Sequence, residues 1–122
     1  MTVVVQRSFI IERGAHREFE RLWREGIWPY FEARGCKIVG YFTNVHGGAT
    51  NEVITNTAYA SLAHWEATRD DAPLPDDASE KVRALYPGYQ AAAKARRDLI
   101  QVSSSRVFRL ASEWVDYSVH EG

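Results

Sequence analysis

The spacing of hydrophobic residues in this chain alternates between the two-residue period of a strand and the longer period of a helix. Strand-like runs rich in β-branched and aromatic residues occupy positions 3–11, 37–44, 52–59 and 99–110. Apolar residues recur every three to four positions from Phe19 to Phe31 and again in stretches between 61 and 98. The order strand, helix, strand, strand, helix, strand predicts an α+β domain of the ferredoxin-like βαββαβ type. Such a domain has a four-stranded antiparallel sheet with helices on one face.

Prolines and serines set the expected limits of the helices. Pro29 is expected to kink or divide the first helix, because proline lacks the backbone N–H that the helix interior needs. The dipeptide at 87–88, Pro-Gly, is expected to interrupt the last helix in the same way. Ser61 and Ser79 are predicted N-caps, since each precedes a helix-like run and can accept from its first turn.

Composition excludes several classes of protein. Fifteen Lys and Arg against sixteen Asp and Glu give a formal charge of −1, without the basic surface of a nucleic-acid binder. Cys36 is the single cysteine, which excludes an intrachain disulfide and a four-cysteine zinc site. No apolar run approaches the ~20 residues of a membrane helix, and residues 1–9 do not look like a signal peptide. We expect a cytoplasmic protein with one domain, 1–110, and a C-terminal tail, 111–122.

The second and third predicted strands carry apolar residues on both faces. Ile38, Phe42 and Ile54 are expected on one face, and Val39, Tyr41, Val53 and Tyr59 on the other. Helices cover only one face of such a sheet, so the other needs a different cover. We expect a second copy of the chain to supply it, which predicts a homodimer joined sheet to sheet into a dimeric α+β barrel.

Short motifs along the chain occur in an order typical of a known family. They are Arg7-Ser8-Phe9 followed by Gly14, Gly40-Tyr41-Phe42-Thr43, Asn51-Glu52-Val53 and Tyr59-Ala60-Ser61-Leu62-Ala63. Together they resemble the NIPSNAP family over residues 3 to 108. The resemblance implies a dimeric α+β barrel. Related barrels include monooxygenases, isomerases, polyketide cyclases and haem-degrading enzymes, whose pocket usually lies between the helices and the sheet of one subunit.

The third strand departs from that family at two positions. The family tends to carry a His and a Trp where this sequence has Thr55 and Thr57. These smaller side chains leave room for a ligand, so both threonines are candidate substrate-binding residues.

Three residues are candidates for moving a proton or polarising a substrate oxygen. Tyr41 and Tyr59 lie on nearby strands, and each offers one hydroxyl; the alternative is packing in the core with the hydroxyl at its rim. His46 lies in the glycine-containing connection between the second and third strands. A neutral imidazole there can act as a general base near pH 7, or His46 is only a turn residue.

Charged and aromatic candidates for substrate binding lie on strands and helices. Arg7 and Arg106 are in the first and last strands, which this topology makes neighbours, so together they can hold a carboxylate or enolate. The alternatives are ion pairs with acidic residues, or exposure. Trp28, at the expected helix irregularity, and Trp65 are candidate pocket residues, with core packing as the alternative.

These candidates predict a protein that binds or acts on a small, partly apolar organic molecule. The expected reactions are oxygenation, isomerisation or cyclisation without a cofactor. The four histidines are scattered along the sequence, so no metal site is expected. The alternative function is a non-catalytic dimeric module for binding or assembly, and the fold alone does not separate the two.

Overall fold

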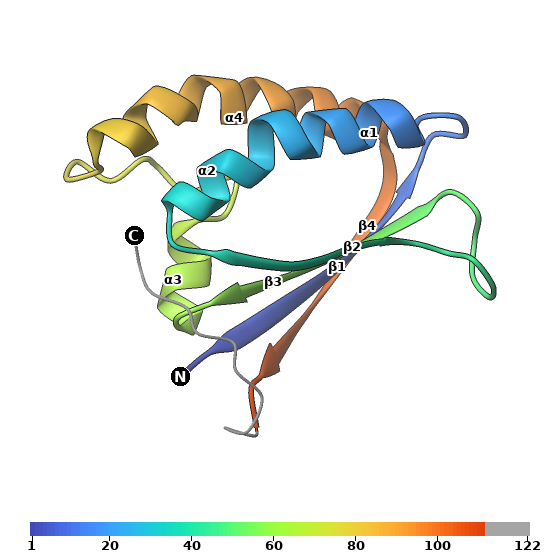
Figure 1. The fold of residues 1–122 in the computed structure, drawn as a ribbon, viewed down its shortest axis with the longest axis horizontal. Coiled ribbons are helices and arrows are strands. Elements are labelled where there is room, and N and C mark those ends of the chain that lie inside the picture. The colour runs from blue at the N-terminus through green and yellow to red at the C-terminus, as the bar shows by residue number, and fades with distance from the viewer. Residues whose placement is uncertain (112–122) are drawn as a thin grey trace.

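The computed structural model describes residues 1–111, which form one antiparallel sheet with its long helices on one side (Figure 1). The strands are β1 Val3–Ile11, β2 Lys37–Thr43, β3 Glu52–Tyr59 and β4 Ile100–Arg109. The helical segments are α1 His16–Leu22, η1 Trp23–Ile27, α2 Trp28–Ala33, α3 Leu62–Ala67 and α4 Glu80–Leu99. The strand order β2-β3-β1-β4 is antiparallel throughout, which confirms the predicted ferredoxin-like fold. Apart from Ala111, the predicted tail at 111–122 lies outside the described residues.

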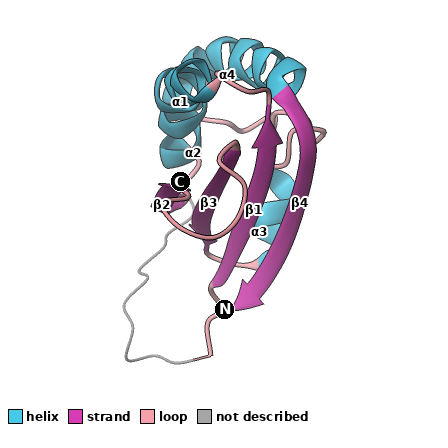
Figure 2. Cartoon of the chain, turned by 90° about the vertical axis from the view of Figure 1, so that its right-hand side faces the viewer, coloured by secondary structure: helices cyan, strands magenta, loops and turns pink. Residues whose placement is uncertain are grey.

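The helices form one layer over the sheet. The segment α1–η1–α2 and helix α4 run alongside each other, while the short α3 lies near the end of β3 (Figures 1 and 2). A small residue lets the two long helical segments approach: a Cβ added to Gly26 would lie 2.4 Å from Cβ of Ala92. None of the helices within residues 1–111 is long and apolar enough to cross a membrane.

The two proline predictions have opposite outcomes. Pro29 follows a π-helical turn in which the N–H of Trp28 donates to the carbonyl of Trp23, five residues back, so the predicted division of the first helix is confirmed. The predicted interruption at 87–88 is wrong, because α4 continues from Glu80 to Leu99 with Pro87 inside it. A proline removes only one helix hydrogen bond. Packing of the buried face of α4 on η1 stabilises the helix on both sides of this position.

Both predicted N-caps are confirmed. The Ser61 hydroxyl accepts from the N–H of His64 at 3.0 Å, and the Ser79 hydroxyl accepts from the N–H of Val82 at 3.2 Å. Each hydroxyl satisfies one of the N–H groups that the first turn of a helix leaves free.

The register of β2 changes one expected grouping of side chains. A shift between Ile38 and Gly40 places Ile38 opposite Thr57, which faces the helices. The prediction that Ile38 shares a face with Phe42 is therefore wrong, because a bulge exchanges the two faces of a strand. Phe42, opposite Ile54, stays on the face turned away from the helices.

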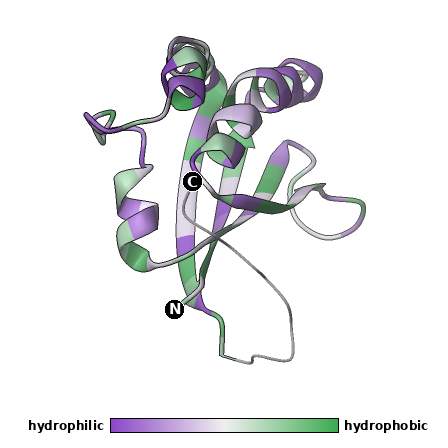
Figure 3. Ribbon diagram, turned by 60° about the vertical axis from the view of Figure 1, so that its left-hand side comes forward, coloured by the Kyte–Doolittle hydropathy of each residue, from purple (hydrophilic) through white to green (hydrophobic). Residues whose placement is uncertain are grey.

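The face of the sheet turned away from the helices, called here the outer face, has a mixed character. Phe42 is 48% exposed, Val102 is 60% exposed and Phe108 is 37% exposed. Polar residues such as Gln6 and Asn56 lie between these apolar residues. Figure 3 shows green hydrophobic stretches along the strands, interrupted by purple hydrophilic ones. Large apolar side chains are therefore accessible on this face.

Candidate functional site

A cavity of about 240 Å³ lies between the helices and the sheet. Its apolar lining consists of Val5, Trp23, Phe31 and Trp65. Its polar lining consists of Arg7, Thr55, Thr57, Tyr59, Thr68, Arg69, Asp70, Asp71, Arg96 and Ser105. The cavity therefore combines aromatic walls with several convergent polar groups, which is the usual character of a small-molecule site.

The sheet wall of the cavity is centred on Arg7. Its neighbours across the two ladders are Thr55 in β3 and Ser105 in β4, so all three side chains point toward the helices. Thr55 is 3% exposed and Thr57 is 5% exposed. These short side chains on the same face leave space beside the long arginine.

Two arginines approach the same aromatic ring. The Cζ atom of Arg7 lies 4.6 Å from the ring centre of Phe9, and that of Arg96 lies 5.4 Å from it. Burial and the neighbouring charge of Arg96 lower the pKa of Arg7. Arg7 has no ion pair with an acidic side chain among residues 1–111. The positive charge of Arg7 is thus partly buried without a carboxylate of its own.

Asp70 follows α3 and is the carboxylate that the second arginine uses. Nη2 of Arg96 lies 3.0 Å from Oδ2 of Asp70, and the Tyr89 hydroxyl donates to Oδ1. Burial raises the pKa of Asp70, but the charges of Arg96 and Arg7 and the hydrogen bonds from Tyr89 and Arg96 together outweigh it. The pKa of Asp70 is therefore below its ordinary value, and this carboxylate is a weak base.

The structure brings several of the predicted site residues together. Those that line the cavity are Arg7, Thr55, Thr57, Tyr59 and Trp65. Burial raises the pKa of Tyr59 well above its ordinary value, so its phenol stays protonated and can donate a hydrogen bond to a ligand. The catalytic and binding roles of these residues stay predictions.

Other predicted residues lie outside the lining of the cavity. Tyr41 packs on Trp23 with ring centres 5.3 Å apart, and burial raises its pKa to about 12. Trp28 also packs against Trp23, at 5.8 Å, and is 38% exposed. His46 is exposed in the connection between β2 and β3. These three residues are not among those that line the cavity, and their predicted roles stay predictions.

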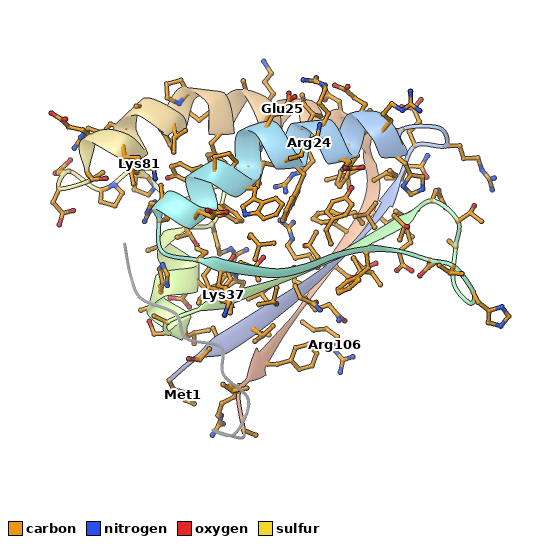
Figure 4. All side chains as sticks on the ribbon, in the orientation of Figure 1. Met1, Arg24, Glu25, Lys37, Lys81 and Arg106 are labelled. Carbon is orange, nitrogen blue, oxygen red and sulfur yellow. The ribbon has the colours of Figure 1, made fainter. Side chains whose placement is uncertain are left out.

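Arg106 lies on the opposite side of the sheet from Arg7. In the β1–β4 ladder Arg106 faces Gln6, while Ser105 faces Arg7. Figure 4 shows Arg106 on the side away from the helices. The predicted pairing of Arg7 with Arg106 at one ligand is wrong, because successive residues of a strand point to opposite faces.

The residue that accompanies Arg7 instead is Arg96, which the sequence reasoning missed. Arg96 is 2% exposed and lies on the buried face of α4 with Tyr89 and Ala92. A charged residue at a helical spacing from apolar ones is a signal for a buried charge that needs a partner. The sequence alone does not single out Asp70 as that partner, because its loop contains several aspartates.

A second buried polar pair, Cys36 and His64, has a structural role. His64 Nδ1 accepts from the N–H of Ala60 at 3.0 Å, and Nε2 lies 2.7 Å from the carbonyl oxygen of Arg34, to which it donates. Both ring nitrogens are therefore engaged with the backbone. Burial raises the pKa of the Cys36 thiol to about 12, so the reactive thiolate is disfavoured. Within residues 1–111, no three His, Cys, Asp or Glu side chains are grouped so that they could hold a metal ion.

Comparison with known proteins places this fold in a family. The NIPSNAP family model matches residues 4–113. The chain belongs to the NIPSNAP family. No curated protein matches the sequence.

Solved structures of NIPSNAP proteins share its fold. An uncharacterized NIPSNAP domain protein from Burkholderia xenovorans is 19% identical, with a TM-score of 0.68 over 93% of this chain and 99% of that chain. A NIPSNAP family protein from Agrobacterium tumefaciens is 24% identical, with a TM-score of 0.67 over 97% of this chain and 100% of that chain. A variant of SnoaB from Streptomyces nogalater, a cofactor-independent oxygenase, is 18% identical, with a TM-score of 0.58 over 94% and 98%. At these identities the likeness shows a shared fold.

Proposed function

We propose that this NIPSNAP-family protein binds a small, partly apolar organic molecule in the cavity between its helices and its sheet. The observation that carries this proposal is the combination of aromatic lining residues, such as Trp23 and Trp65, with the charged Arg7. The volume of about 240 Å³ is smaller than the roughly 300–1,000 Å³ of sites for drug-sized ligands. A molecule with a single ring fits this space better than one with several fused rings.

We propose oxygenation, isomerisation or cyclisation without a cofactor as the reactions of this site. Each of these can begin with transfer of a proton from the substrate to water, which leaves an enolate or phenolate. In oxygenation, O₂ is then the oxidant, with one oxygen atom entering the product and the other leaving as water. The positive charge of Arg7 would stabilise that anion in a partly buried site, and the Tyr59 hydroxyl can donate to the same oxygen. The oxygenase activity given for SnoaB, which shares the fold, supports the first of these reactions.

The second candidate function is a binding or assembly module without catalysis. One observation favours it: among residues 1–111, no histidine lines the cavity, and Asp70, one of two carboxylates in the lining, has a lowered pKa. A site without a base matched to neutral pH is poorly suited to abstract a proton. Under this alternative, the cavity holds its ligand unchanged.

A binding screen with a cavity-filling variant tests the proposal. Single-ring acids, phenols and amides are titrated against the protein, with tryptophan fluorescence as the signal because Trp23 and Trp65 line the cavity. Thr57→Leu reduces the space and should abolish binding. Thr43→Leu, a similar change at an exposed end of β2, should leave binding unchanged. If no compound binds, or both variants bind like the parent protein, the cavity is not the site.

Turnover separates the enzyme from the module. Each ligand that binds is incubated with the protein under ¹⁸O₂ and examined by mass spectrometry. Incorporated label indicates oxygenation, whereas a product of unchanged mass with a new retention time indicates isomerisation or a cyclisation that loses no water. Full recovery of every ligand unchanged would favour the non-catalytic module.

We also propose that the functional unit is a homodimer joined through the outer faces of two sheets. The proposal is supported by the exposed apolar residues Phe42, Val102 and Phe108, which a second copy would cover. Two-fold pairing of one surface with itself is the commonest arrangement in homo-oligomers. The ligand cavity lies on the other side of the sheet, so each subunit would hold its own site.

A further inference from the structure

We infer that the ligand of the cavity carries a carboxylate group and that Arg7 is the residue that binds it. This inference rests on the proposed small-molecule function and names the chemical class of the ligand. It starts from the number of positive and negative side chains near the buried ring of Phe9.

Two guanidinium groups lie beside one partly exposed carboxylate, that of Asp70, at this point of the fold. Arg7 and Arg96 both lie against the Phe9 ring, and Asp70 makes its ion pair with Arg96 at 3.0 Å. Arg97 approaches the same carboxylate only at 4.0 Å and is exposed. One positive charge, that of Arg7, therefore remains without a matching anion among residues 1–111. A ligand anion would supply the missing charge.

The surroundings of Arg7 leave its guanidinium available to a ligand. Its neighbours on the two adjacent strands, Thr55 and Ser105, have short side chains. Arg7 is itself one of the residues that line the cavity. By contrast, Nε of Arg96 is sealed from solvent without a hydrogen-bond partner among the described residues. Arg96 is therefore buried and paired with Asp70, whereas Arg7 can offer donors to a ligand.

The geometry favours a monoanionic carboxylate over a phosphate. A guanidinium presents two parallel N–H donors that match the two oxygens of a carboxylate. The unmatched charge is a single one, which suits one carboxylate better than the two charges of a phosphate group. A small cavity with Trp23 and Trp65 in its wall further fits an acid whose body is one ring.

The test compares acids with neutral molecules of the same shape by isothermal titration calorimetry. The probes are benzoate, phenylacetate and cyclohexanecarboxylate, each paired with its primary amide. We expect at least one acid to bind, and its amide to bind about tenfold or more weakly, because the amide lacks the charge that strengthens the hydrogen bonds.

Variants of Arg7 identify the residue responsible. Arg7→Met keeps the length of the side chain and removes its charge, so acid binding should fall about tenfold or more. Arg7→Lys keeps the charge but lacks the two parallel N–H donors of a guanidinium. Its affinity for the acid should therefore lie between those of the parent protein and Arg7→Met. Arg17→Met is the matched control, since Arg17 is exposed on α1, and it should bind like the parent protein. Thermal unfolding confirms that each variant is folded.

The outcomes distinguish the carboxylate assignment from the proposed small-molecule site on which it rests. Equal binding of acids and amides, or undiminished acid binding by folded Arg7→Met and Arg7→Lys, would overturn the carboxylate assignment and leave a small-molecule site in place. If no acid or amide binds, both the assignment and the single-ring ligand are wrong.

Discussion

Arg96 and Asp70 form an ion pair of 3.0 Å in which the guanidinium is almost fully buried. The pair fastens the loop after α3 to helix α4, and Tyr89 adds a hydrogen bond to the same carboxylate. One wall of the cavity is thus held in place by the buried charge of Arg96 and the partly exposed carboxylate of Asp70.

Replacement of Asp70 should reveal how much this ion pair contributes to the stability of the folded protein. Asp70→Asn leaves the Arg96 guanidinium, which is 2% exposed, without its counter-charge. We expect the free energy of unfolding to fall by about 3 kcal/mol, the low end for a broken buried pair, because Arg96 is buried but Asp70 is 29% exposed. Chemical denaturation at pH 7 measures the change. Asp76→Asn, an exposed substitution in the same loop, is the control and should change stability by less than about 0.5 kcal/mol. A loss equal to that of the control would contradict the role given to the pair.

The same pair predicts how stability depends on pH. Because the folded pKa of Asp70 is lowered, its contribution is present above the unfolded pKa of ~3.9. That contribution is lost as the pH falls through the lower folded value. The stability difference between the parent protein and Asp70→Asn should therefore shrink below about pH 4. Denaturation curves from pH 3 to pH 7 measure it, and a difference that grows toward low pH would contradict the sign.

Gly26 determines how closely η1 approaches α4. A methyl group at this position would lie 2.4 Å from Cβ of Ala92 and 3.2 Å from the carbonyl oxygen of Gly88. Gly26→Ala should destabilise the protein by about 1–3 kcal/mol despite the better helix propensity of alanine. Denaturant unfolding provides the measurement. The double variant with Ala92→Gly should recover part of the loss, since it removes the clash; strictly additive effects would argue against this contact.

Cys36 should be inert in the folded protein. Its thiol is buried beside His64, and burial raises the thiol pKa to about 12, so little thiolate forms at pH 8. We expect slow labelling by iodoacetamide under native conditions and rapid labelling in denaturant. Mass spectrometry over time distinguishes the two. Fast labelling of the native protein would show that the thiol is accessible and ionised.

The fold was predictable from local patterns, whereas the charged part of the site was not. Strand β3 and the caps Ser61 and Ser79 follow from spacing and residue type alone. The pairing of Arg7 with Arg96 depends on which residue of β4 faces the helices and on the position of α4. Both depend on the tertiary structure. If the β1–β4 register differed by one residue, Arg106 would lie beside Arg7 on the face toward the helices.

The outer face of the sheet makes a separate prediction about assembly. Ile54 lies on this face beside Phe42, so Ile54→Asp would place a charge in the proposed interface. We expect a loss of at least about 2 kcal/mol of association free energy. Light scattering should give about twice the chain mass of 13.9 kDa for the parent protein and a lower mass or precipitation for the variant. Val45→Asp, in an exposed loop, is the control. A parent protein at the single-chain mass would rule out the dimer.

The position of a bound ligand tests the central claim most directly. Intermolecular nuclear Overhauser effects are recorded between cyclohexanecarboxylate, or whichever acid of the panel binds most tightly, and the methyl groups of the protein. Ligand contacts with Val5 and Thr57 are predicted, because both line the cavity between helices and sheet. Contacts with Ile54 and Val102 on the outer face, and none with Val5 or Thr57, would contradict the account.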